Sequence, residues 1–183
     1  MAFDGTGYMS LGSSINIGKE NTIAFWVYKT NTHAVITGEA SYGNDYSIYI
    51  SSTQGTYYRV GGAALWSYNV PNDAWVHLVF TRNQTALKLY VNGVSLGSNT
   101  AGAITSTTDT KFDTIGDKSN GSHNGGASPF IGKLDEFAAW DKELTADQIK
   151  FDIYEASATA NKSADFINNP NLPDPVAWYR MGD

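Results

Sequence analysis

Short runs of alternating apolar and polar residues dominate the chain and predict strands far more often than helices. The clearest run lies at 75–97, where WVHLVF, ALKLYV and VSL are separated by the polar turn 83–85 and by Asn92-Gly93. Asn-Gly between two strand-like runs is the signal of a type I′ hairpin, whose two central residues both need positive φ. This stretch therefore predicts three consecutive antiparallel strands.

Similar runs on both sides of this meander extend the prediction to the whole chain. Gly61-Gly62 marks a second two-residue hairpin, and Thr145 and Gln148 form a capping box that predicts one short C-terminal helix carrying Ile149 and Ile153. We interpret 157–175, rich in Asn, Ala and Pro, as a surface connection, and 176–183 as a closing strand that pairs near the N-terminal one. The stretch 3–11 predicts two short strands joined by a Gly-rich turn, and the remaining predicted strands are 21–28, 34–38, 45–51, 55–60, 63–70, 111–116 and 130–140.

The composition fits one all-β domain over residues 1–183 and excludes several classes of function. The net charge is −6 with no Lys/Arg cluster, which argues against nucleic acid and anionic membrane surfaces as partners. There is no cysteine, so disulfides and thiolate metal sites are excluded. No apolar run reaches the ~20 residues of a membrane span, and the N-terminus lacks the layout of a signal peptide.

Four tyrosine and tryptophan residues crowd the predicted 55–70 hairpin, and we predict that Tyr58, Trp66 and Tyr68 form a platform for sugar rings. The alternative is that these rings make cross-strand pairs that cover the sheet. Trp26 lies in a near-continuous apolar strand and is interpreted as core. His77 is interpreted as a strand histidine beside the core.

Four segments, taken in order, carry a family resemblance. They are FDGTGYMSLG at 3–12, FWV at 25–27, the 75–97 hairpin region and IGKLDEFAAWDKELTADQI at 131–149. Together they resemble the laminin-G-like and pentraxin-like jelly-roll domains of the concanavalin A-like superfamily. The ending AWYRMGD at 177–183 also resembles laminin-G-like proteins encoded by marine bacteriophages.

The resemblance implies an antiparallel β-sandwich of two sheets that often binds Ca²⁺ and often recognises glycans. The places of the pentraxin Ca²⁺ ligands hold Asn44, Asp45 and Asp117, and the same 116–128 loop offers Asn120 and His123 as ligand contacts. Carboxylate and carbonyl oxygens at separated points are what Ca²⁺ requires. The further acidic pair of pentraxins falls on 127–129, which has no carboxylate.

Asp135 lies inside a predicted strand, where an unpaired carboxylate is costly. It has two possible uses: a structural Ca²⁺ site shared with Asp4 or carbonyls of the opening loop, or acceptance of backbone N–H bonds. Its neighbour Glu136 is expected to face the other way, into solvent.

No catalytic constellation is present in the sequence. The Glu-x-Asp-x-x-Glu strand of the retaining glucanases of this fold is absent, and no nucleophile elbow or phosphate-binding loop is found. We therefore expect a non-catalytic, lectin-like, carbohydrate-binding protein, with Ca²⁺ as a possible cofactor and a glycan or glycosylated surface as partner. The alternatives are a structural, decoration or protein-binding domain of a larger multidomain or virion protein, and a glycoside hydrolase or polysaccharide lyase. The expected location is extracellular or on a virion surface.

Overall fold

The computed structural model describes residues 1–38, 46–60, 62–99, 108–117, 129–158 and 164–181. Its strands are β1 (Ala2–Asp4), β2 (Met9–Gly18), β3 (Glu20–Lys29), β4 (His33–Gly38), β5 (Tyr46–Ser51), β6 (Thr56–Arg59), β7 (Ala63–Trp66), β8 (Trp75–Asn83), β9 (Ala86–Val91), β10 (Val94–Asn99), β11 (Thr110–Ile115), β12 (Ile131–Trp140) and β13 (Ala177–Tyr179). Two short helices, η2 (Gln148–Glu155) and α1 (Ala156–Ala158), follow one another directly. All the predicted strands that fall in these ranges are present.

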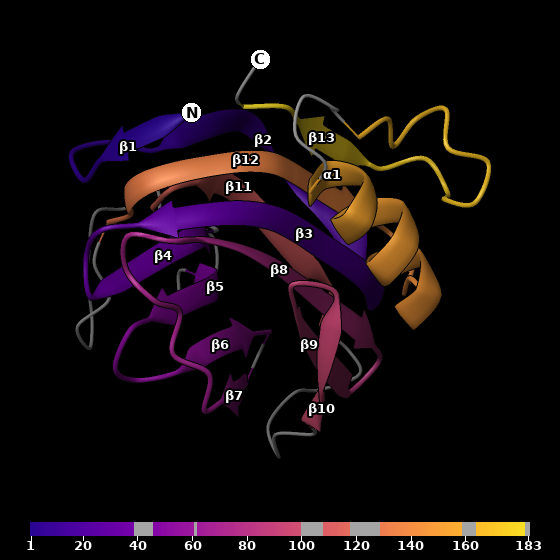
Figure 1. Cartoon of the computed structure of the whole chain (residues 1–183), viewed down its shortest axis with the longest axis horizontal. Helices are drawn as coiled ribbons and strands as arrows, with labels where there is room; N and C mark the ends of the chain where they lie inside the picture. The colour runs from indigo at the N-terminus through magenta and orange to yellow at the C-terminus, as the bar shows by residue number, and fades with distance from the viewer. Residues whose placement is uncertain (39–45, 61, 100–107, 118–128, 159–163, 182–183) are drawn as a thin grey trace.

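The strands form two antiparallel sheets packed face to face, which is a jelly-roll β-sandwich (Figure 1). Sheet A has seven strands in the order β1-β12-β3-β8-β9-β10, with β13 also pairing with β12. Sheet B has six, in the order β2-β11-β4-β5-β6-β7. The predicted all-β sandwich with one short C-terminal helical segment is therefore confirmed.

The main core lies between the sheets and follows from side-chain alternation along each strand. In β3, the alternate residues Ile23, Phe25 and Val27 point inward and are fully buried. Phe25 stacks on Phe80 of β8 and Phe137 of β12, with ring centroids 6.2 and 5.8 Å apart. The inward positions of three neighbouring strands thus form one continuous apolar layer.

The predicted Asn92-Gly93 turn has the expected geometry. Asn92 has φ 49° and Gly93 has φ 76°, as a type I′ turn requires. The Asn92 side-chain oxygen accepts the backbone N–H of His77 at 2.9 Å, which ties the turn to the neighbouring strand β8. The three-stranded meander is confirmed.

Replacing Gly93 by alanine is expected to lower the free energy of unfolding by about 2 kcal/mol, part of it from the positive φ. The rest comes from packing, because a Cβ atom here would lie 2.8 Å from Cδ1 of Tyr154. Gly97→Ala is the matched control, since Gly97 has φ 90° but no atom within 4 Å of the added Cβ. Urea unfolding of both variants measures the difference, and equal losses would show that Tyr154 does not pack on the turn.

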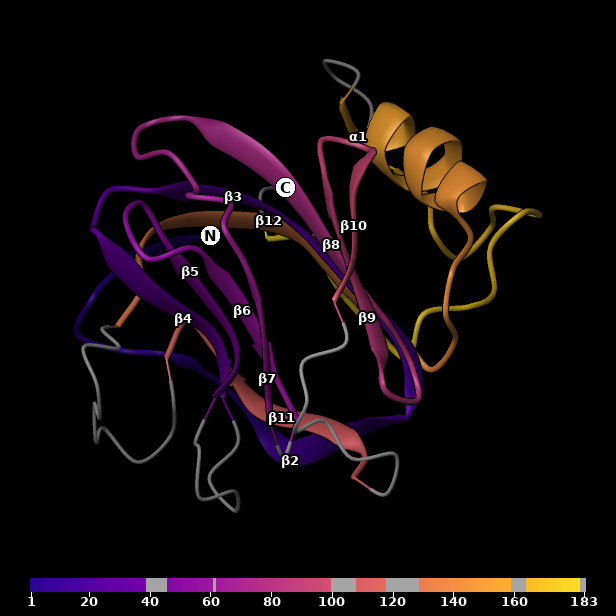
Figure 2. The ribbon, with the colours of Figure 1, turned by 90° about the horizontal axis from the view of Figure 1, so that it is seen from below.

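A second core covers part of the outer face of sheet A, beneath the helix and the C-terminal segment (Figure 2). Ala24, Val79, Tyr90, Ala138 and Trp140 contribute from the sheet. The covering layer supplies Leu144, Ile149, Ile153, Ala164, Phe166 and Leu172. The stretch 157–175 is thus more than the surface connection expected, because its described part buries a phenylalanine and a leucine against the sheet.

The capping box that opens the helix is present as predicted. The Thr145 backbone N–H donates to Gln148 Oε1 at 2.9 Å, and the Gln148 N–H donates to Thr145 Oγ1 at 3.3 Å. Ile149 and Ile153 are fully buried, so the predicted apolar face of the helix is the one that contacts the sheet.

A β-bulge interrupts β12 between Asp135 and Ala138. Glu136 in this bulge has φ 48°, and its carboxylate accepts the Trp178 indole N–H at 2.7 Å. The prediction that Glu136 faces solvent is wrong, because the bulge turns it against β13 and leaves it buried.

The first and last strands both pair with the same edge of β12. Phe3 lies opposite Gly132, and Trp178 lies opposite Ala138. The Met1 ammonium donates to the Leu134 and Met181 carbonyl oxygens, so the two described ends of the chain meet there. The expected pairing of the closing strand near the N-terminal strand is confirmed.

Within the described ranges, no helix is long and apolar enough to cross a membrane.

Candidate functional site

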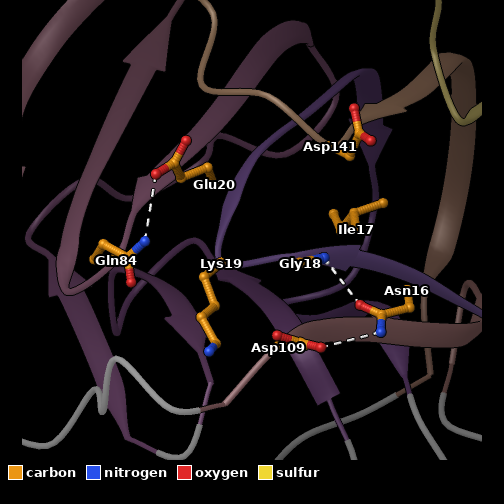
Figure 3. A pocket seen from close by; sticks show the side chains of 8 residues that line it. All are labelled: Asn16, Ile17, Gly18, Lys19, Glu20, Gln84, Asp109 and Asp141. Atoms are coloured by element: carbon orange, nitrogen blue, oxygen red, sulfur yellow. Dashed lines mark hydrogen bonds between the residues drawn. The ribbon is translucent and has the colours of Figure 1, made fainter.

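An open pocket of about 500 Å³ lies where several turns converge at one end of the sandwich (Figure 3). The turn between β2 and β3, the turn between β8 and β9, and the residues before β11 and after β12 all line it. We call it the end pocket. Its lining is Asn16, Ile17, Gly18, Lys19, Glu20, Gln84, Asp109 and Asp141.

Hydrogen bonds between its own side chains hold the polar groups of the end pocket in place. Asn16 Nδ2 donates to Asp109 Oδ2 at 3.1 Å, and the amide oxygen of Asn16 accepts the Gly18 N–H at 2.9 Å. Gln84 Nε2 donates to Glu20 Oε1 at 3.3 Å. Carboxylates, amides and the Lys19 ammonium together offer acceptors and donors to a ligand rich in hydroxyl groups.

Two of the three predicted aromatic contacts belong to the core. Tyr58 is fully buried between the sheets, where its hydroxyl hydrogen bonds to Asn21 Oδ1 at 2.8 Å and to Thr110 Oγ1 at 3.0 Å. Burial raises the pKa of the Tyr58 hydroxyl to about 12. Trp66 is also buried and packs edge-on against Phe80. The prediction is corrected for both residues, whose rings have no open face for a ligand.

Tyr68 is the remaining member of that predicted platform. It is half-buried against the edge of the core, and burial raises the pKa of its hydroxyl. Because Tyr58 and Trp66 lie inward, the predicted platform is not assembled, and the alternative of rings that cover the sheet describes this hairpin better.

The predicted calcium ligands are only partly within the described residues. Asn44, Asp45, Asn120 and His123 lie outside them. Asp117 is buried just after β11, and its carbonyl oxygen accepts the Thr114 hydroxyl at 2.6 Å. Asp109 of the end pocket precedes β11 and Asp117 follows it, so these two carboxylates lie at opposite ends of this strand. In the part of the chain that the structure describes, no three or more His, Asp and Glu residues gather as a metal site would need.

Asp135 and Asp4 do not share a site. Asp4 pairs with Ile131, four residues before Asp135 on β12, a separation of about 13 Å at the rise of a strand. The Asp4 carboxylate instead accepts the N–H and hydroxyl of Thr6. Asp135 Oδ1 accepts the backbone N–H of Glu136 at 3.0 Å. This contact agrees with the second of the two uses expected for Asp135, the acceptance of backbone N–H bonds.

The outer face of sheet A carries aromatic residues that the sequence interpretation assigned to the core or overlooked. In β3 these are Trp26 and Tyr28, which alternate with the inward Phe25 and Val27. Trp75 lies opposite Tyr28 on β8 and is 45% exposed. Because successive side chains of a strand point to opposite faces, the sequence NTIAFWVY could have placed these two aromatic residues on the face opposite the core.

His77 lies on the same outer face and is almost fully buried, as a strand histidine beside a core should be. Its ring packs against Trp26 and Tyr154, with centroids 5.0 and 5.6 Å apart. Nδ1 is buried without a hydrogen-bond partner. Burial lowers the pKa of His77 to about 3, so the ring is neutral at physiological pH.

The two curved sheets and the helix over one of them define a jelly-roll β-sandwich domain. The chain belongs to the Concanavalin A-like lectin/glucanases superfamily, because residues 3–150 match its Laminin_G_3 family. Among curated proteins, no sequence match is found.

Solved structures share this fold at low sequence identity. Domain 4 of AbnA, an extracellular arabinanase from Geobacillus stearothermophilus solved with arabinotriose, is 23% identical with a TM-score of 0.53, over 81% of this chain and 73% of that one. A SAP-like pentraxin from Limulus polyphemus is 15% identical with a TM-score of 0.60, over 90% and 83%. Domains LG4-5 of the mouse laminin alpha1 chain are 14% identical with a TM-score of 0.59, over 79% and 44%.

Proposed function

We propose that this protein is a non-catalytic carbohydrate-binding domain. The observation that carries the proposal is the hydrogen-bonding set of the end pocket, in which paired amides and carboxylates present acceptors and donors at one open depression. Sugar hydroxyl groups both donate and accept, so such a mixed set suits them. Membership of a lectin and glucanase superfamily, and a similar domain solved with arabinotriose, add support.

The absence of the glucanase carboxylate motif from the sequence favours binding over hydrolysis. Incubation with a panel of chromogenic glycosides and polysaccharides tests this part, and product release above that of the heat-denatured protein would contradict it.

Calcium assistance is a separate part of the proposal. The candidate ligands remain Asn44, Asp45 and Asp117, of which Asp117 is described and follows β11 at the end away from the end pocket. An ion held there by carboxylate and carbonyl oxygens could contact sugar hydroxyls directly.

A glycan array probed in Ca²⁺ and again with a chelator tests both parts. We expect selective binding to at least one glycan class, and its loss on chelation would support an ion in the recognition site. Binding that survives chelation would instead place the sugar on side chains alone. An array without selective binding in either buffer would contradict the carbohydrate-binding proposal.

Variants of the end pocket then locate the site. Asp109→Asn and Gln84→Ala are each expected to weaken glycan binding about fivefold, the effect of losing about one hydrogen bond in the site. Asp174→Asn removes an exposed carboxylate elsewhere and should leave binding unchanged. Unchanged affinity in both pocket variants would move the sugar to another surface.

One observation favours a structural or protein-binding role as the second candidate, such as a decoration domain of a virion. The edge strand β10 is exposed along its length, and Val94 is 66% exposed. An edge strand with apolar side chains can pair with another chain. Light scattering after size exclusion tests it: a defined oligomer that Val94→Lys dissolves would support this role, and a monomer would contradict edge pairing between copies.

A further inference from the structure

Three strands of sheet A place a row of side chains on its outer face, beyond the end of the helical cover. Lys133 of β12 lies opposite Tyr28 of β3, and Tyr28 lies opposite Trp75 of β8. Directly opposed residues of adjacent strands share a face, and the row spans about 10 Å at the usual strand spacing. We call Lys133, Tyr28 and Trp75 the outer row.

The members of the outer row support one another. The rings of Tyr28 and Trp75 are 5.8 Å apart between centroids and inclined by 57°, which gives two connected, tilted aromatic surfaces. Lys133 Nζ lies 5.9 Å from the Tyr28 centroid. Because all three side chains come from paired strands and the rings have few rotatable bonds, little conformational freedom remains to be lost on binding.

The next row along the same face shows why this one stays open. Asp135, Trp26 and His77 lie opposite one another two residues further along the strands. Tyr154 of helix η2 packs on Trp26 and His77, and the Trp26 indole N–H donates to Ser157 Oγ at 2.8 Å. The helix therefore covers this second row and leaves the outer row exposed, with Asp135 half-buried at its border.

The charged and aromatic side chains of the outer row and its border favour a sugar over a protein as the ligand. An ammonium donor at Lys133 and a carboxylate acceptor at Asp135 lie two residues apart on one face, and an exposed tryptophan lies at the other end of the row. Hydroxyl groups can satisfy both charges, whereas the apolar face of a sugar ring can stack on Trp75. The exposed part of one tryptophan is about 100 Å², well below the roughly 800 Å² that each partner of a stable protein interface buries.

From these contacts we infer that the outer row is a second glycan-binding surface, distinct from the end pocket, which takes a neutral pyranose stacked on Trp75 and Tyr28. This inference rests on the proposed carbohydrate-binding function. An acidic sugar is disfavoured there because the Asp135 carboxylate at the border offsets the attraction of the Lys133 ammonium, which leaves the loss of water from the sugar carboxylate uncompensated. The outer row lies near the far end of β3 from Glu20 of the end pocket, about 25 Å away at the rise of a strand.

Titration calorimetry with the strongest neutral oligosaccharide from the array tests the inference. Trp75→Ala is expected to weaken binding at the outer row at least tenfold, which appears as a loss of one binding site per chain if the end pocket takes the same sugar. Trp75→Phe, which keeps an aromatic face, should lose less than threefold at the outer row. Tyr8→Ala is the matched control, since Tyr8 is exposed to almost the same extent on another part of the fold. Unfolding midpoints of all three variants check that they fold.

The specificity is tested with matched oligosaccharides that carry a uronic acid. The wild-type protein should bind them more weakly than the neutral set, and Asp135→Asn should reduce that difference at least threefold. Unchanged discrimination in Asp135→Asn would overturn the assignment of neutral sugars.

Separate outcomes distinguish the two proposals. If the wild-type protein binds glycans and Trp75→Ala binds equally well while the end-pocket variants lose binding, the outer row is not a glycan site and the proposed function stands. If no glycan binds the wild-type protein, both proposals fail. A protein ligand that is lost with Trp75→Ala, without any glycan binding, would assign the outer row to a protein partner and overturn this inference.

Discussion

Acidification from pH 6.5 to pH 3 is expected to lower the free energy of unfolding by about 4 kcal/mol through His77 alone. Burial lowers the pKa of His77 to about 3, whereas an unfolded histidine titrates near 6.5. Below pH 6.5 the unfolded chain therefore binds a proton that the folded protein does not. This contribution to stability is fully present above pH 6.5 and falls by about 1.4 kcal/mol per pH unit down to pH 3.

The physical cause is burial, which takes the ring out of water and so disfavours the charged imidazolium form. The ring is packed between Trp26 and Tyr154, and Nδ1 is buried without a partner. His77→Phe keeps a ring of similar size and removes the titration. Chemical unfolding of both proteins from pH 3 to 8 isolates the histidine, because the carboxylates are common to both. Parallel stability curves for the two proteins would show that His77 is protonated in the folded state or reached by water.

Phe166→Ala is expected to lower the free energy of unfolding by about 3–5 kcal/mol. Phe166 is 1% exposed, and its ring contacts Trp140 and Trp178 with centroids 5.5 and 5.1 Å apart. Removing it leaves a cavity between the C-terminal segment and sheet A, and the surrounding large rings can collapse into that cavity only in part.

The neighbouring Ile167 supplies the control. Its side chain is 57% exposed, so Ile167→Ala should change stability by no more than about 0.5 kcal/mol. Urea unfolding of the two variants compares adjacent positions in one segment. A loss below about 1 kcal/mol for Phe166→Ala would mean that the segment does not pack on the sheet as described, since truncation of a buried phenylalanine costs more.

Local rules predicted much of the fold. The Asn92-Gly93 turn, the strands beside it and the capping box of Thr145 and Gln148 all have the expected geometry. Each depends on neighbours within a few residues, so the information lies in the sequence itself. The family resemblance added the two-sheet jelly roll, which matches the observed topology.

The candidate site was less predictable because exposure depends on what covers each face. The sequence predicted Tyr58 and Trp66 as part of an exposed platform for sugar rings, but the opposite sheet buries them. Tyr28 and Trp75 were predicted only as strand residues, and their exposure follows from the helix, which stops short of them. The alternating pattern of a strand assigns its residues to two faces. It does not show which of these faces will be covered by another element.

The sequence by itself determined where most strands, the turns and the helix lie, because hydrophobic period, turn residues and caps act over a few residues. Only the tertiary structure decided which aromatic rings remain open and which polar side chains converge. The end pocket joins Asn16 to Asp109, and the outer row joins Tyr28 to Lys133, across distances in the chain that no local pattern spans. Register and packing between strands bring such residues together, so both candidate surfaces are products of the fold.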